Sequence, residues 1–118
     1  MKAEAAAARV AGIAGFLAVS LGAFGAHGLK ALLEANGTAA IWQTAVLYHL
    51  AHAVAALAAS RAVPLVSWIW GAGMLIFSGS LYVLALTGLK WLGMVTPLGG
   101  LILLAGWALV IWRPVRYS

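Results

Sequence analysis

Four long stretches of this chain contain no charged residue. They cover residues 10–29, 35–60, 62–89 and 91–112, and they hold 20, 26, 28 and 22 residues. A helix needs roughly 20 apolar residues to cross a hydrocarbon core about 30 Å thick. Each stretch is therefore long enough to span a bilayer, and the sequence predicts an integral membrane protein with four transmembrane helices.

The length of the chain leaves little room for anything else. Of its 118 residues, 65% are hydrophobic and only 8% are charged, whereas a soluble domain carries about 25% charged residues. Four spans with short connections use residues 1–118, so we expect a single domain. The predicted fold is all-α: a membrane bundle of four transmembrane helices arranged as two hairpins.

Charge and cysteine content narrow the classes of partner and chemistry. The net charge of +5 does not predict a nucleic-acid partner, because the basic residues are scattered at the ends of the predicted spans and form no patch. The lipid bilayer is the partner that the composition predicts. The chain has no cysteine, which excludes disulfides, thiolate metal sites and thiol redox chemistry.

The first predicted helix covers residues 6–26. Gly28 is a candidate C-cap for it, since glycine adopts the left-handed conformation at low cost. This region also resembles a signal peptide, but the apolar run at 10–26 is longer than the usual signal core of about 7–15 residues. We therefore expect the segment to be retained as a membrane span.

A short connection leads to the second predicted helix, at residues 39–59. Segment 29–34 is amphipathic and is predicted to lie at the membrane interface. Asn36-Gly37 is typical of a turn, and Thr38 is a candidate N-cap for the second helix. This connection completes the first hairpin.

The second predicted hairpin begins with a tight turn around Arg61. The third helix covers 64–87, with Pro64 in its first turn, where proline is tolerated, and Gly88 after its last residue. The fourth helix covers 91–112. Together these two helices complete the four spans.

Thr96-Pro97 gives the fourth predicted helix two interpretations. Pro97 can kink a continuous helix by removing one backbone hydrogen bond. Alternatively, Thr96 caps a new helix, and residues 91–95 enter the membrane as an irregular segment. Gly99-Gly100 allows close backbone approach in either case.

The distribution of positive charge predicts an orientation. Five basic residues fall on one side of the predicted membrane, and they are Lys2, Arg9, Arg61, Arg113 and Arg116. The other side has Lys30 and Lys90. This difference predicts a multi-pass inner-membrane protein with both termini in the cytoplasm. The six tryptophans lie mostly near predicted span ends, as interfacial aromatic residues do.

The second predicted helix carries most of the candidate polar site. Thr44, Tyr48 and His52 are spaced i, i+4, i+8 and so share one face. His49 projects about 60° from His52 at about 100° per residue, near the middle of the span. Ionisable residues at that depth usually face a bundle interior or a wet cavity.

The third predicted helix offers partners for that site. Ser78 and Tyr82 share a face and are in a position to complete hydrogen bonds to the second helix. The simplest interpretation is that neutral histidines bind neighbouring helices and fix their packing. Alternatively, the same residues line a polar pocket for a small molecule, lipid, quinone or proton.

Metal or haem binding is a weaker hypothesis. No carboxylate lies within any predicted span, and His27, the third histidine, lies near the opposite membrane surface. We therefore predict no metal and no cofactor. His27 is predicted to cap the end of the first helix, to form the rim of a pocket that faces the surface, or to contact another subunit.

Two further patterns bear on function. Small residues at Gly15, Ala18, Gly22 and Gly25 form a seam on the first predicted helix, which suits packing within the chain or self-association. The sequence contains no evident set of nucleophile, base and acid, because both of its carboxylates are predicted near membrane surfaces. We therefore do not expect an enzyme.

Several segments resemble one protein family across nearly the whole chain. They are GAFGAHGL at 22–29, then Trp42, Ala45, Tyr48, His49 and His52, FSGSLY at 77–82, LTG at 86–88, TPLGG at 96–100 and GW at 106–107. In these the chain resembles the domain-of-unknown-function 423 family of small bacterial inner-membrane proteins, related to eukaryotic transmembrane protein 256. The resemblance implies a four-helix inner-membrane protein and brings no reaction, substrate or cofactor.

These observations favour one functional class over another. The leading hypothesis is a non-enzymatic membrane protein that acts through helix packing with itself or with other membrane proteins. The alternative is binding or passage of a small molecule at the polar residues of the bundle. The seven candidate ligand-binding residues are Thr44, Tyr48, His49, His52, Ser78, Tyr82 and His27.

Overall fold

The computed structural model describes residues 2–116, which contain five α-helices, one 3-10 helix and no strand. The elements are α1 (Lys2–Ala26), α2 (Lys30–Asn36), α3 (Ala39–Ala59), α4 (Pro64–Thr87), η1 (Lys90–Met94) and α5 (Thr96–Trp112). Four segments are long and apolar enough to cross a membrane: α1, α3, α4 and the combination of η1 with α5. The all-α fold with four spans is therefore confirmed, and the predicted bounds of α3 and α4 agree with the structure.

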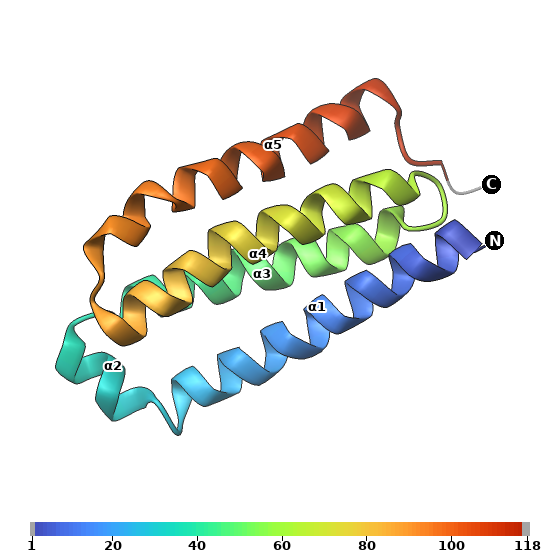
Figure 1. Cartoon of the computed structure of the whole chain (residues 1–118). Helices are drawn as coiled ribbons and strands as arrows, with labels where there is room; N and C mark the ends of the chain where they lie inside the picture. Colours follow the sequence, from blue (N-terminus) through green and yellow to red (C-terminus); the bar gives the residue numbers. More distant parts are fainter. Residues whose placement is uncertain (1, 117–118) are drawn as a thin grey trace.

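The long helices form two antiparallel hairpins, α1 with α3 and α4 with α5 (Figure 1). Helix α1 packs against α3 and α4, whereas α5 packs against α4 and η1 and has no helix contact with α1 within residues 2–116. The chain is 49 Å long but only 27 Å by 18 Å in cross-section. Both termini and the turn between α3 and α4 lie at one end, while α2 and η1 lie at the other (Figure 1).

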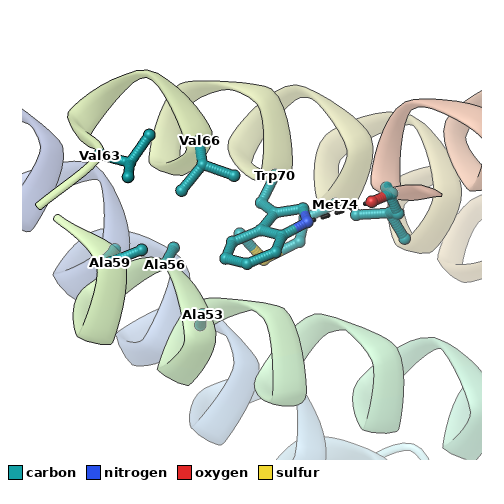
Figure 2. Close-up of a cluster of buried hydrophobic side chains, with 9 residues drawn as sticks. Ala53, Ala56, Ala59, Val63, Val66, Trp70 and Met74 are labelled. Atoms are coloured by element: carbon teal, nitrogen blue, oxygen red, sulfur yellow. Dashed lines mark hydrogen bonds between the residues drawn. The ribbon is translucent and has the colours of Figure 1, made fainter. Parts of the chain in front are cut away.

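Two clusters of buried apolar side chains form the core. The Trp70 cluster, drawn in Figure 2, lies toward the end with the termini, and its members are Ala11, Ala53, Ala56, Ala59, Val63, Val66, Trp70, Met74 and Leu103. The Trp42 cluster lies toward α2, and its members are Leu33, Trp42, Ala45, Tyr82 and Ala85. Most of these side chains are small, which allows the helix backbones to approach closely.

Glycines bring α4 and α5 into close contact. A Cβ atom added at Gly73 would lie 3.1 Å from the backbone nitrogen of Leu103, and one added at Gly99 would overlap the backbone of Phe77. Gly106 faces the indole of Trp70 in the same way. Only a residue without a side chain fits at these three points.

The small-residue seam of α1 faces α3. Ala18 is fully buried, and a Cβ added at Gly22 would lie 3.2 Å from Cγ1 of Val46. Gly25 lies against the indole of Trp42, whose Nε1–H donates to the carbonyl of Leu21 at 2.9 Å. The predicted packing role of this seam within the chain is confirmed.

The connection between α1 and α2 corrects the predicted cap at Gly28. Positive φ occurs among the described residues only at Gly37 (69°) and Gly88 (73°), so Gly28 is not left-handed. The chain leaves α1 through turns in which the Leu29 N–H donates to the Phe24 carbonyl at 2.7 Å. These turn hydrogen bonds form without positive φ at Gly28, so this connection does not require a left-handed residue. The predicted turn at Asn36-Gly37 is confirmed, with Gly37 as the left-handed C-cap of α2, and the predicted closing of α4 by Gly88 is confirmed as well.

Thr38 occupies the N-cap position of α3, but its side chain makes no cap hydrogen bond there. Its hydroxyl instead donates to the carbonyl of Ala85 at 2.7 Å, and Asn36 donates to the same oxygen at 3.3 Å. Ala85 lies in the last turn of α4, where carbonyls lack a partner within the helix. Thr38, which the sequence predicts to cap α3, therefore supplies a hydrogen-bond donor to a carbonyl at the C-terminal end of α4.

The fourth span is broken, as the second interpretation of Thr96-Pro97 required. The 3-10 helix η1 ends at Met94, Val95 is the N-cap, and α5 begins at Thr96. Pro97 lies in the first turn, where its missing N–H costs least. The prediction that Thr96 caps this helix is wrong: Thr96 is the first residue of α5, and its hydroxyl donates to the carbonyl of Leu92 at 3.2 Å.

Candidate functional site

The two histidines of α3 contact different neighbours. His49 faces Tyr82 on α4, whereas His52 faces Trp107 on α5. Each side chain is 7% exposed. Side chains three residues apart point about 60° away from each other around the helix axis. His49 therefore points toward α4, while His52 points toward α5.

His49 and Tyr82 form a buried pair between α3 and α4. Nδ1 of His49 lies 2.9 Å from the phenolic oxygen of Tyr82. The Tyr82 ring also packs against Trp42, with centroids 4.7 Å apart. This pair therefore links α3 to α4 at the middle of the bundle.

The partners of His52 fix its protonation state. Nδ1 lies 2.7 Å from the carbonyl oxygen of Tyr48, and a carbonyl only accepts, so Nδ1 carries the hydrogen. The Nε1–H of Trp107 donates to Nε2 at 3.0 Å, so Nε2 carries the lone pair. His52 is therefore a neutral imidazole in which both nitrogens are engaged.

Trp70 completes the contact between α3, α4 and α5. Its ring centroid lies 5.9 Å from that of His52 and 4.6 Å from that of Trp107. Its Nε1–H donates to the carbonyl of Leu103 at 3.1 Å, which is the dashed line in Figure 2. Three rings and two hydrogen bonds thus attach α5 to the rest of the bundle.

Serines of α4 bind the backbone of α3. Ser78 donates to the carbonyl of Ala45 at 2.8 Å, and Ser67 donates to the carbonyl of Ala56 at 2.7 Å. The predicted bond from Ser78 to the second helix is confirmed. Within residues 2–116, no buried side-chain nitrogen or oxygen lacks a hydrogen-bond partner.

The structure does not bring all the predicted site residues together. Tyr48 is partly exposed, and its ring lies parallel to that of His52 at 6.2 Å. Thr44 is on an exposed face of α3, and His27 is exposed in the turn between α1 and α2. The described part of the chain contains no group of three or more His, Asp or Glu side chains placed to hold a metal ion.

Two tryptophans of the site were misplaced by the sequence prediction. Trp42 and Trp70 are only 3% and 2% exposed, so they belong to the core and not to an interfacial belt. Trp107 is partly exposed, yet it binds His52. Trp68, Trp91 and Trp112 are exposed, in keeping with the predicted interfacial role. No spacing within the sequence connects Trp107 to His52, because they lie 55 residues apart.

Grooves flank the polar contacts on both sides. A groove of about 490 Å³ between α3 and α5 is lined by Tyr48, His52 and Trp107 together with apolar residues. A second groove, of about 530 Å³, lies between α1 and α4, and its lining includes His49 and Tyr82. Volumes of this size suit a small molecule or one lipid chain.

Comparison with known proteins assigns the chain to a family. The chain belongs to the family described as "Protein of unknown function (DUF423)", which matches residues 21–100. It is 40% identical to the UPF0382 membrane protein YwdK of Bacillus subtilis over 86% of this chain and 89% of the relative. It is 41% identical to the UPF0382 inner membrane protein YgdD of Escherichia coli over 90% of this chain and 86% of the relative.

These relatives confirm the bacterial family that the sequence motifs indicated, and with it a membrane protein of four apolar helices. A staphylococcal relative, the UPF0382 membrane protein SAB0533 of Staphylococcus aureus, is 37% identical over 86% of this chain and 88% of its own length. No solved structure matches the chain. The relation to eukaryotic transmembrane protein 256 stays an expectation.

Proposed function

We propose that this member of the DUF423 family is a non-enzymatic inner-membrane protein that acts by packing with itself or with partner membrane proteins. The observation that carries the proposal is the use of its interior polar groups. His52 accepts a hydrogen bond from Trp107 on α5 and binds a carbonyl of its own helix, and Ser67 and Ser78 donate to carbonyls of α3. Groups committed in this way stabilise one arrangement of helices and are not free for acid–base chemistry.

The outward face of α5 is the surface best suited to association. Among the helices of the described chain, the backbone of α5 lies close only to α4 and η1, and its contact with α3 is made by the side chain of Trp107. Its outer side chains are large and apolar, and Leu104 and Ile111 are 64% and 80% exposed. In a bilayer this face is covered either by lipid or by another protein.

Cysteine cross-linking tests this proposal without interference, because the natural chain has no cysteine. Leu104→Cys and Ile111→Cys place thiols on the outer face of α5, and Phe16→Cys on α1, 73% exposed, is the matched control. We expect a bifunctional thiol reagent in native membranes to give a protein adduct of defined mass at the α5 positions and not at Phe16. Recovery of monomer alone at all three positions would contradict association through α5.

The proposed location includes an orientation. Five basic residues, namely Lys2, Arg9, Arg61, Arg113 and Arg116, belong to the end of the bundle that holds the termini, and Lys30 and Lys90 belong to the other end (Figure 1). An excess of Lys and Arg favours the cytoplasmic side, so we propose that both termini are cytoplasmic. A C-terminal alkaline phosphatase fusion should be inactive and a fluorescent protein fusion bright; the reverse pattern would overturn the orientation.

A further inference from the structure

The groove between α1 and α4 has the features of a site for a small ligand. Its walls are apolar, and Ile13, Leu17 and Leu75 at its edges are 62%, 46% and 76% exposed. The buried pair of His49 and Tyr82 contributes to its lining. An apolar cavity with few convergent polar groups is the usual form of a site for a small molecule.

The polar pair retains one unused hydrogen-bonding position. A phenolic oxygen can donate once and accept twice, and the side-chain hydrogen bond of Tyr82 is the one with His49. If Tyr82 donates to His49, its oxygen can still accept; if His49 donates, the Tyr82 O–H is still free. A ligand hydroxyl satisfies both cases, because it is a donor and an acceptor.

Charge and depth define the rest of the ligand. No Lys, Arg, Asp or Glu lines the groove. His49 lies ten residues from each end of α3 (39 to 49 and 49 to 59), which is about 15 Å of helix on either side. A charged head group at that depth would lack a counter-charge and would be costly to bury. The groove is therefore complementary to a neutral molecule.

From this geometry we propose that the groove between α1 and α4 binds a neutral, membrane-soluble molecule with a hydroxyl head, such as a long-chain or isoprenoid alcohol. The apolar chain lies along Leu17 and Leu75, and the hydroxyl binds the Tyr82 oxygen beside His49. The proposal is independent of association through α5, since α5 does not contribute to this groove.

Two glycines provide a matched pair of variants. A Cβ atom added at Gly79 or at Gly12 meets no atom within 4 Å, so neither position resists a side chain. Gly79 lines the groove, whereas Gly12 does not. Gly79→Val therefore fills the groove, while Gly12→Val adds the same group to α1 outside it.

The experiment uses the full chain in lipid vesicles and a fatty alcohol that carries a diazirine in its chain. After photolysis, mass spectrometry locates the modified peptides. We expect saturable labelling of α1 and α4 beside the groove, competed by excess unlabelled alcohol but not by the alkane of the same chain length, which can neither donate nor accept a hydrogen bond. Labelling should fall about tenfold in Gly79→Val and stay unchanged in Gly12→Val. Tyr82→Phe should weaken competition by about fivefold, the scale of one hydrogen bond.

The opposite outcome is equally clear. Labelling that rises linearly with probe concentration, and is the same in Gly79→Val and Gly12→Val, would show ordinary contact with bulk lipid and overturn the proposal. Equal competition by the alcohol and the alkane would overturn the role of Tyr82. The alkane comparison uses the unmodified protein, so it holds even where a variant folds poorly. Thermal unfolding followed by circular dichroism identifies such a variant.

Discussion

Gly106 on α5 lies directly against the indole of Trp70 on α4, and this contact sets how closely the two helices approach. A Cβ atom added at Gly106 would lie 2.9 Å from Cε2 of Trp70 and closer still to its Nε1. Carbon atoms in contact are normally about 3.5–4.0 Å apart. The Gly106→Ala substitution therefore requires the indole or the helix to move by roughly 1 Å.

Neighbouring contacts oppose that movement. Gly73 and Gly99 hold α4 and α5 together in the next turns toward η1, and each already lies against backbone atoms of the other helix. Overpacking of this kind costs about 1–3 kcal/mol. Displacing the indole also weakens its bond to Leu103, which adds about 0.6–1.7 kcal/mol. We expect Gly106→Ala to lower the free energy of unfolding by about 2–4 kcal/mol.

Reversible unfolding by SDS in mixed micelles, followed by circular dichroism, measures this loss. Gly12→Ala is the control, because its Cβ would meet open space; we expect no loss, and a gain of up to about 1 kcal/mol. Trp70→Leu should reduce the cost of Gly106→Ala to below about 1 kcal/mol, since the clashing ring is gone. Additive losses in the double variant would refute the contact as the cause.

Three other outcomes follow from the same interior contacts. Trp107→Phe should cost about 0.6–1.7 kcal/mol and should cost nothing further in a His52→Leu background; equal losses in both backgrounds would contradict their bond. Thr38→Val should lower stability by about 0.5–1.5 kcal/mol and speed amide exchange in the last turn of α4, whereas Thr44→Val on the exposed face of α3 should do neither. Added Zn²⁺ or a chelator should leave the melting temperature unchanged, because both nitrogens of His52 are engaged; stabilisation by Zn²⁺ would count against that geometry.

The positions of the spans could be predicted because they depend on local properties of the chain. The spacing of charged residues located four membrane helices, and Pro64 and Gly88 located both ends of α4. Pro97 indicated a break because proline lacks an N–H wherever it occurs. None of these inferences needed information about a distant residue.

Capping roles were less predictable, since a side chain near a helix end has more than one possible partner. Thr38 has the right type and position to cap α3, yet it binds Ala85 on α4 instead. Gly28 looked like Gly88 in sequence but does not adopt positive φ. The path of the chain after each helix decided between these conformations, and that path depends on where the next element packs.

The site shows the same division. The sequence alone placed His49, His52, Ser78 and Tyr82 in the membrane and on faces able to meet, because helical periodicity follows directly from residue spacing. Only the tertiary structure decided that His49 binds Tyr82 while His52 accepts a hydrogen bond from Trp107. Those pairings depend on the rotation and separation of whole helices, which packing at glycine contacts fixes and which no single segment of the chain encodes.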